Sequence, residues 1–172
     1  VEDDILNIVK ATLTIKKSFV ESDEFDVDFR KSLNLGHSFA HAIESSSRFR
    51  IPHGIAVIIG CSLAFHFSID RGMLEPSSFL QHIDLIDKLL LVSSEYFESH
   101  VLDISLLKAA LLSDKKNSLP TSVLLILPSG NQPNSYCMKR QNVEINKVVD
   151  FVDNFIIDMR FCSQSLLLAG SS

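Results

Sequence analysis

The segment from Ile55 to Ile69 constrains the fold of this chain more than any other. It is apolar on nearly all sides, and a helix without a polar face is stable only where other elements surround it. The run is short for a membrane span and contains Gly60, Ser62 and His66, which also argue against a lipid environment. It therefore predicts a helix over 53–71 in the middle of a helical bundle, not in a membrane.

Several other segments repeat apolar side chains every three to four residues, the spacing of a helix with one buried face. The helices predicted from this spacing cover 3–20, 29–46, a stretch that begins near Pro76, 106–112 and 145–156. The segment from Thr121 to Leu127 is instead β-branched and apolar and predicts a strand. A turn-rich loop at 128–134 and a return strand over 135–140 would complete a hairpin. We expect a mainly α-helical domain with a small β-hairpin over 1–160, followed by a tail at 161–172.

Charge and cysteine content limit the classes of partner. The net charge is −5 and the Lys and Arg residues are dispersed, so neither nucleic acid nor an anionic membrane is indicated as a partner. The widely spaced Cys61, Cys137 and Cys162 are typical of a reduced, cytoplasmic protein without a disulfide framework. The acidic N-terminus does not resemble a signal peptide. The absence of an initiator Met suggests a piece of a longer protein.

Three histidines, His37, His41 and His53, fall within a short segment. The first two are four residues apart and share one face of a helix, whereas His53 follows a turn marked by Pro52. Neutral imidazoles from two helices are good ligands for a divalent metal. A zincin protease site is excluded because Ser38 stands where that motif needs a glutamate. From the residues alone, a three-histidine metal site and an incidental group of histidines both remain open.

Basic and amide side chains accompany the histidines. Arg30 and Asn34 precede His37 by seven and three residues, near the same face of the expected helix. Lys16 lies upstream, and the run from Asp114 to Asn117 lies downstream. If these groups converged on a metal, they would suit an anionic, phosphorylated substrate. Each of them alone is better explained as a solvated surface residue.

A family resemblance is carried by an ordered pattern, Lys16…Arg30-x-x-Leu33-Asn34-x-Gly36-His37-x-x-x-His41-Ala42-Ile43-Glu44…His53-Gly54. This pattern resembles the C-terminal domain of 3-dehydroquinate synthase and related sugar phosphate cyclases, lyases of the shikimate pathway of aromatic amino acid biosynthesis. Asp114-Lys115-Lys116 and the strand ending at Pro128 resemble later elements of that domain. The resemblance covers roughly residues 3–158. It implies a dehydroquinate synthase-like helical domain that forms part of a larger two-domain enzyme.

The resemblance implies a role for each histidine. His37 and His53 match the two histidine ligands of the family's metal, zinc or cobalt. His41 matches an active-site histidine that helps in proton transfer. Asp26 stands where the family commonly has a glutamate with an acid–base role.

The resemblance also implies a set of substrate-binding residues. Lys16, Arg30 and Asn34 match residues that hold the phosphorylated sugar. One of Lys115 and Lys116 matches a further lysine near the substrate, and the two remain equivalent at this point.

The implied reaction is the cyclisation of a phosphorylated seven-carbon sugar acid, in which NAD transiently oxidises a hydroxyl and phosphate then leaves. In the family, the NAD-binding domain and a glutamate metal ligand precede the helical half, and no Gly-rich dinucleotide loop occurs in this chain,. We therefore expect NAD to be bound mainly by the missing N-terminal domain, and this chain to be inactive alone. Two departures from the family are Ile55, in place of a usual glutamate, and Ala40, in place of a common glycine.

Two alternatives stay open. The segment from Ile51 to Ala56 also resembles iron-dependent alcohol dehydrogenases, although Arg30 and the Leu33–His37 run favour the cyclases. The chain could also be a non-catalytic helical module. The sequence leaves open which sugar phosphate is the substrate, and the family is often dimeric, so a homodimer is one expected state.

Overall fold

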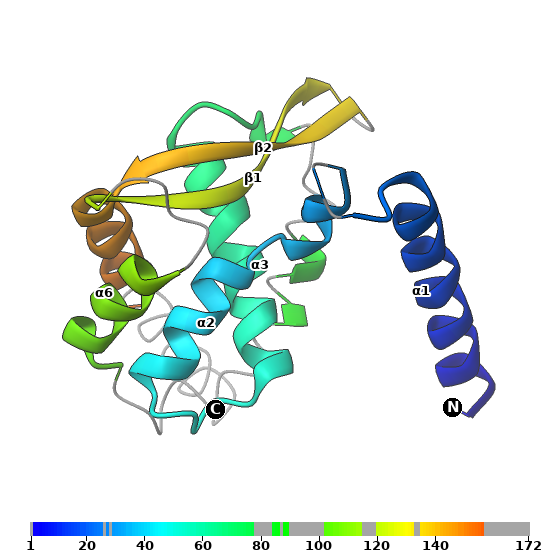
Figure 1. The fold of residues 1–172 in the computed structure, drawn as a ribbon, viewed down its shortest axis with the longest axis horizontal. Helices are drawn as coiled ribbons and strands as arrows, with labels where there is room; N and C mark the ends of the chain where they lie inside the picture. The colour runs from blue at the N-terminus through cyan, green and yellow to red at the C-terminus, as the bar shows by residue number, and fades with distance from the viewer. Residues whose placement is uncertain are drawn as a thin grey trace, which may run out of the picture. The chain divides into compact units, whose positions relative to one another are not determined.

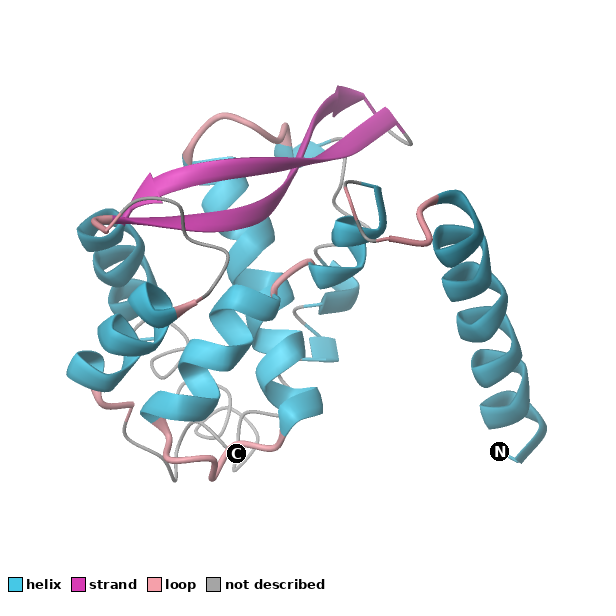
Figure 2. Cartoon of the chain, viewed as in Figure 1, coloured by secondary structure: helices cyan, strands magenta, loops and turns pink. Residues whose placement is uncertain are grey.

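A computed structural model of the chain describes residues 2–25, 27, 29–77, 84–86, 88–89, 102–114, 120–132 and 135–156. The chain is mainly α-helical, and its described part contains a two-stranded antiparallel sheet (Figure 2), as the sequence predicts. Two compact units, Val1–Asn34 and Leu35–Ser172, are each held together by their own contacts.

Some predictions fall outside the described residues. They concern the acid Asp26, the lysines Lys115 and Lys116, and the tail at 161–172. The helix predicted from Pro76 is described only in part, and residues 76–77, 84–86 and 88–89 are helical.

The first unit begins with the helix α1, Glu2–Ser22, which confirms the prediction of a helix over 3–20. A short 3-10 helix, η1, follows at Phe29–Asn34. The carboxylate of Asp23 organises the connection, because it accepts hydrogen bonds from the backbone N–H groups of Val27 at 2.8 Å and Arg30 at 3.0 Å. These two hydrogen bonds satisfy backbone N–H groups that would bond to backbone carbonyls in a regular helix.

The predicted continuous helix over 29–46 is wrong, because the chain breaks at Gly36. After η1, a turn leads into α2, His37–Ser46, and Gly36 has φ 74°, in the left-handed region that favours glycine,. A Cβ on Gly36 would lie 2.5 Å from the backbone nitrogen of Cys61 and 2.6 Å from the carbonyl carbon of Gly60. Glycine is thus required here both for the turn and for the close approach of α2 to the next helix.

The second unit is built around α3, His53–Asp70, the predicted central helix. By length and composition alone α3 could cross a membrane, but half of its most apolar window is buried inside the unit. The helix α2 packs against both α3 and α6, Ile104–Ser113, while the hairpin lies across one end of the helices (Figure 1). The core draws on all of these elements and on a last helix over 145–156; its larger members include Phe39, Ile43, Ile59, Leu63, Phe67, Leu107, Leu111, Val123, Leu125, Leu127, Val148, Val152 and Ile156.

The hairpin is longer than predicted. The strand β1 spans Ser122–Gln132 and pairs with β2, Ser135–Glu144, so most of the residues assigned to a loop at 128–134 belong to a strand. The extension has a physical cause outside the hairpin. The backbone N–H of Gly130 donates to the carbonyl of Met73 at 3.0 Å, and its carbonyl accepts from the N–H of Glu75 at 3.2 Å.

The helix α6 confirms the prediction for 106–112 and is fixed at its start by Asp103. This carboxylate accepts from the backbone N–H of Leu106 at 3.2 Å and of Ser105 at 3.0 Å, as an N-cap residue does. The hydrogen bonds, led by that of Leu106, lower the pKa of Asp103. Asp103 thus fixes the start of α6, and Asp114, directly after the end of this helix, lies beside α2.

Candidate metal site

Three imidazole rings meet between α2 and α3. His37 is the first residue of α2, His41 lies one turn later, and His53 is the first residue of α3. The ring centroid of His37 is 6.0 Å from that of His41 and 6.0 Å from that of His53, and the other two centroids are 6.4 Å apart. The fold therefore brings the three sequence-predicted histidines into one group.

Two of the rings have one nitrogen already engaged. Nδ1 of His53 lies 3.1 Å from Oε1 of Glu44, and Nδ1 of His37 lies 3.2 Å from the carbonyl oxygen of Leu35. An ionised carboxylate and a carbonyl can only accept, so in both rings Nδ1 must carry the proton and donate. Each neutral ring then keeps a free lone pair on Nε2, the form in which histidine binds a metal.

The geometry of this pair fits a metal ion as a partial site. Two imidazoles on one tetrahedral zinc have centroids about 5 Å apart, given Zn–N bonds of about 2.0–2.1 Å, and the 6.0 Å between His37 and His53 is close to this. Among the described residues, no three His, Cys, Asp or Glu side chains are placed to hold an ion together. His37 and His53 therefore supply two donors of the correct kind, and a complete site needs further ligands.

His41 differs from its two neighbours. Its side chain is exposed, and its ring stacks on His53 with an interplanar angle of 26°. Within the described part of the chain no hydrogen bond engages either of its nitrogens. An imidazole with both nitrogens accessible can donate or accept a proton, a use distinct from that of a ligand with a fixed tautomer.

Three residues near the histidines, Gly54, Ala40 and Ile55, differ in what surrounds them. A Cβ on Gly54 would meet no atom within 4 Å, so there is open space directly beside His53. Ala40 is fully buried, facing the contact between Gly36 and Gly60. Ile55 is half-buried and packs against the core rather than standing free at the site.

The predicted substrate-binding residues are distributed over both units. Lys16 is exposed on α1, and Arg30 and Asn34 are half-buried on η1, all within the first unit. The guanidinium of Arg30 donates to the carbonyl of Glu24 at 3.2 Å. Because the helix breaks at Gly36, the argument that Arg30 and Asn34 share a helical face with the histidines is wrong, and their part in the site stays a prediction.

The end of α6 does reach the histidine helix. Oγ of Ser38 lies 3.4 Å from Oδ2 of Asp114 and 3.4 Å from the carbonyl oxygen of Leu124. The residue before Lys115 and Lys116 is thereby held beside the first turn of α2. The aspartate of the predicted Asp-Lys-Lys element is thus adjacent in space to the residue that follows His37.

Sequence reasoning missed Glu44 as a functional residue. Its side chain is 14% exposed, and its carboxylate accepts the hydrogen bond from Nδ1 of His53. The available signal was its position seven residues after His37, two helical turns along the same face of α2,. The pattern included Glu44 only as part of a motif, without a role.

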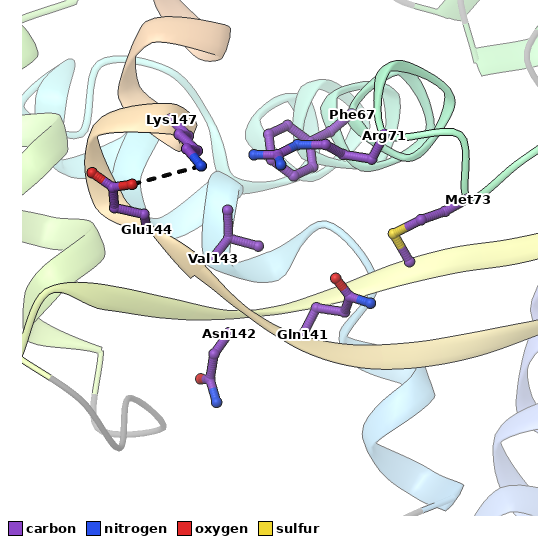
Figure 3. A pocket seen from close by; sticks show the side chains of 8 residues that line it. All are labelled: Phe67, Arg71, Met73, Gln141, Asn142, Val143, Glu144 and Lys147. Atoms are coloured by element: carbon purple, nitrogen blue, oxygen red, sulfur yellow. Dashed lines mark ion pairs between the residues drawn. The ribbon is translucent and has the colours of Figure 1, made fainter.

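A pocket of about 360 Å³ lies at the opposite end of α3. Figure 3 shows the guanidinium of Arg71 over the ring of Phe67, with the two 4.9 Å apart, and Lys147 paired with Glu144 at 3.7 Å. The charged groups that line this pocket are thus matched within the protein. Its polar chemistry differs from that of the histidine group, where two ring nitrogens are left free.

Comparison with known proteins identifies a consistent set of relatives. The family described as 3-dehydroquinate synthase C-terminal matches residues 1–117. A 3-dehydroquinate synthase of Helicobacter pylori (strain P12) is 32% identical over 130 residues, which are 75% of this chain and 36% of that protein. The bifunctional 3-dehydroquinate synthase/phosphatase of Fusobacterium nucleatum subsp. nucleatum is 33% identical over 170 residues, 95% of this chain and 24% of that protein. The chain therefore spans about a quarter to a third of the length of these relatives.

Proposed function

Since this chain belongs to the 3-dehydroquinate synthase C-terminal family, we propose that it is the helical metal- and substrate-binding half of a 3-dehydroquinate synthase-like sugar phosphate cyclase. The proposed domain covers residues 1–160 and works within a longer protein that also contains an N-terminal NAD-binding domain. The observation that carries the proposal is the pair of histidines, His37 and His53, whose ring centroids lie 6.0 Å apart in an edge-to-face arrangement with Nδ1 engaged in both.

His37 and His53 hold a divalent metal, zinc or cobalt, in this proposal. When bound, such an ion polarises a hydroxyl or carbonyl oxygen of the substrate. The two histidines contribute by presenting Nε2 lone pairs from the first residues of two packed helices. A third ligand comes from outside the described residues.

Proton transfer is assigned to His41, with Asp26 in a supporting acid–base role. His41 is exposed and adjacent to both proposed ligands, so a substrate held at the metal would be within reach of its nitrogens. NAD, held mainly by the N-terminal domain, would accept a hydride from a substrate hydroxyl carbon and return it later, so that the transient ketone would acidify the neighbouring C–H bond. His41 then moves protons as phosphate leaves and the ring closes.

The substrate is a phosphorylated sugar acid, held through its charges. Lys16 and Arg30 neutralise the phosphate and carboxylate, and Asn34 donates hydrogen bonds. One of Lys115 and Lys116 adds a further cation, which is supported by the position of Asp114 beside α2. The chain's net charge of −5 makes such a local cationic set a specific feature and not a general property of the surface.

The family match favours this lyase over the iron-dependent alcohol dehydrogenase interpretation. We place the protein in the cytoplasm, in keeping with the free thiols of Cys61 and Cys137,. Homodimers are proposed as the working state of the whole enzyme.

The test is phosphate release by the full-length protein after its metal has been removed with a chelator. Zinc or cobalt, NAD and the acyclic phosphorylated seven-carbon sugar acid should together restore release of inorganic phosphate. His37→Ala should abolish it, whereas His66→Ala, which removes a histidine from the same packed helices but not from the group, should retain it.

Two outcomes would contradict the proposal. A folded full-length protein that releases no phosphate from any sugar phosphate tested would support a non-catalytic module, and NADH formation from simple alcohols with iron would support a dehydrogenase. The 172-residue chain alone is expected to show no turnover.

A further inference from the structure

We propose that Glu44 is a positioning residue, which fixes the tautomer and the orientation of His53 without touching metal or substrate. The proposal concerns the protonation pattern of His53 itself, and its consequence for metal binding rests on the proposed function. The distance of 3.1 Å between Oε1 of Glu44 and Nδ1 of His53 is a hydrogen-bond distance,. A carboxylate acceptor makes this a charge-assisted bond, which is stronger than one to a neutral acceptor.

Glu44 and His53 differ in how far their side chains are exposed to solvent. The side chain of Glu44 is 14% exposed and that of His53 is 58% exposed. The carboxylate therefore lies on the protein side of the ring, where it is shielded from water, and the ring presents its opposite edge outward. A buried acceptor and an exposed ligand edge are the arrangement by which a carboxylate orients a metal-binding histidine.

The turn that joins α2 to α3 is shaped to bring these partners together. Arg48 and Phe49 both have positive φ, 54° and 59°, a conformation that L residues other than glycine rarely adopt,. The backbone N–H of Phe49 donates to the carbonyl of Glu44 at 2.7 Å, and that of Arg48 donates to the carbonyl of Ser45 at 3.0 Å. Glu44 thus anchors the strained turn through its carbonyl and receives His53 through its carboxylate.

His37 lacks a comparable carboxylate. Its Nδ1 donates to the backbone carbonyl of Leu35, an acceptor that no side-chain substitution removes. Both proposed ligands therefore carry their proton on Nδ1, but the acceptor is a backbone carbonyl for His37 and a side-chain carboxylate for His53. Only the tautomer of His53 depends on a side chain. This difference allows His37 to serve as an internal reference in the test.

The first experiment measures tautomers directly in this 172-residue chain, freed of metal and labelled with ¹⁵N at histidine. Long-range ¹H–¹⁵N correlation spectra distinguish a ring protonated at Nδ1 from one protonated at Nε2. Wild-type His53 should be protonated at Nδ1. Glu44→Ala should move the proton largely to Nε2, Glu44→Gln should keep it at Nδ1 through the amide oxygen, and His37 should be unchanged in both variants.

Glu144→Ala is the matched control, because it removes a carboxylate from an exposed ion pair with Lys147. It should leave every histidine signal in place. Protonation of wild-type His53 at Nε2, or an unchanged His53 tautomer in a folded Glu44→Ala variant, would overturn the proposal. If Glu44→Ala fails to fold, the Glu44→Gln result decides, since loss of the Nδ1 proton in that variant would contradict the acceptor role.

The second experiment measures zinc affinity of the full-length protein by competition with a chelating dye. Glu44→Ala should weaken zinc binding about 10–100-fold, the usual cost of losing a carboxylate that orients a histidine ligand, and Glu44→Gln should weaken it less. Unchanged affinity in Glu44→Ala would overturn the metal consequence of the proposal. A tautomer change in a protein that shows no metal-dependent phosphate release would retain the role of Glu44 and reject the proposed function.

Discussion

The two ends of α3 differ in what their polar side chains are left free to do. At its first residue, His53 donates through Nδ1 to Glu44 and keeps Nε2 available. At the other end, Arg71 lies over the ring of Phe67 and Lys147 pairs with a neighbouring glutamate, around a pocket of about 360 Å³. Charged groups that are already paired within the protein have less to gain in free energy from binding a ligand. A histidine ring with a free Nε2 lone pair can still coordinate a metal ion. The two ends therefore differ in whether their polar groups are already paired, and only the histidine end has ring nitrogens without a hydrogen-bond partner among the described residues.

The comparison is tested most strongly by removing the proposed ligands. His37→Ala and His53→Ala should each weaken zinc binding to the full-length protein by about sixtyfold to seven-hundredfold. The reason is that four-ligand structural zinc sites bind with about 10–16 kcal/mol, or about 2.5–4 kcal/mol for each ligand, and about 1.4 kcal/mol is tenfold in affinity. Competition with a chelating dye measures the change.

His66 provides the control for this experiment, because it lies on α3 toward the pocket end, with its ring 5.3 Å from that of Phe155. His66→Ala should change the zinc affinity less than twofold. Equal losses in His53→Ala and His66→Ala would remove the distinction between the two ends of the helix.

The second-largest effect is expected at Gly36, where the turn before α2 contacts the backbone of α3, and it concerns the stability of the fold. Gly36→Ala adds a Cβ where φ is 74° and backbone atoms of α3 lie 2.5–2.6 Å away. The left-handed conformation costs about 1–2 kcal/mol and overpacking about 1–3 kcal/mol, so we expect a loss of about 2–5 kcal/mol in the free energy of unfolding. Denaturant titration of the chain measures it.

Gly54→Ala is the matched glycine substitution, since its Cβ would enter open space on α3. It should leave stability unchanged or raise it by about 0.5–1 kcal/mol, because alanine is the better helix former. If both substitutions were equally harmless, the two helices would not meet as closely as the structure shows.

These positions also show what the sequence could and could not predict. The central helix was predictable because its apolar character on all sides leaves no alternative environment, and β1 because its β-branched run lies between prolines. The break at Gly36 was not, since apolar spacing continues on both sides of it and the sign of φ depends on the approach of Gly60. The extra length of β1 arises from hydrogen bonds between Gly130 and residues 73 and 75, which local patterns do not reveal.

For the site, spacing was enough to group His37 and His41, because a helix places residues four apart on one face, and His53 was added because it follows closely after the turn at Pro52. The different uses of their nitrogens depend on hydrogen bonds to Leu35 and Glu44, and these follow from the turns before α2 and α3. The strained turn at Arg48 and Phe49 has no sequence signal of its own, since neither residue is one that usually takes a positive φ,.

The pocket end should respond to substitution in stability alone. Arg71→Ala removes a guanidinium that is 4.9 Å from the Phe67 ring and should lower the free energy of unfolding by about 0.5–1 kcal/mol, the usual value for a partly exposed cation–π contact. Zinc affinity should not change. Lys147→Ala, which breaks an exposed ion pair, should cost less still. A loss of metal binding in Arg71→Ala would show that the two ends are coupled.

The smallest expected effect concerns the middle of α3, where Cys61 follows the glycine contact. Burial raises the pKa of the Cys61 thiol, and only the thiolate is nucleophilic. Alkylation of Cys61 should therefore be a few-fold slower than that of the exposed Cys137, and its rate should continue to rise at pH values where that of an ordinary cysteine has levelled off. Mass spectrometry of each site measures the rates.

Gly36→Ala should accelerate the alkylation of Cys61 and leave that of Cys137 unchanged, because only Cys61 is covered by the contact between the two helices. Equal rates for Cys61 and Cys137 in the unmodified sequence would mean that the contact between the two helices does not protect Cys61.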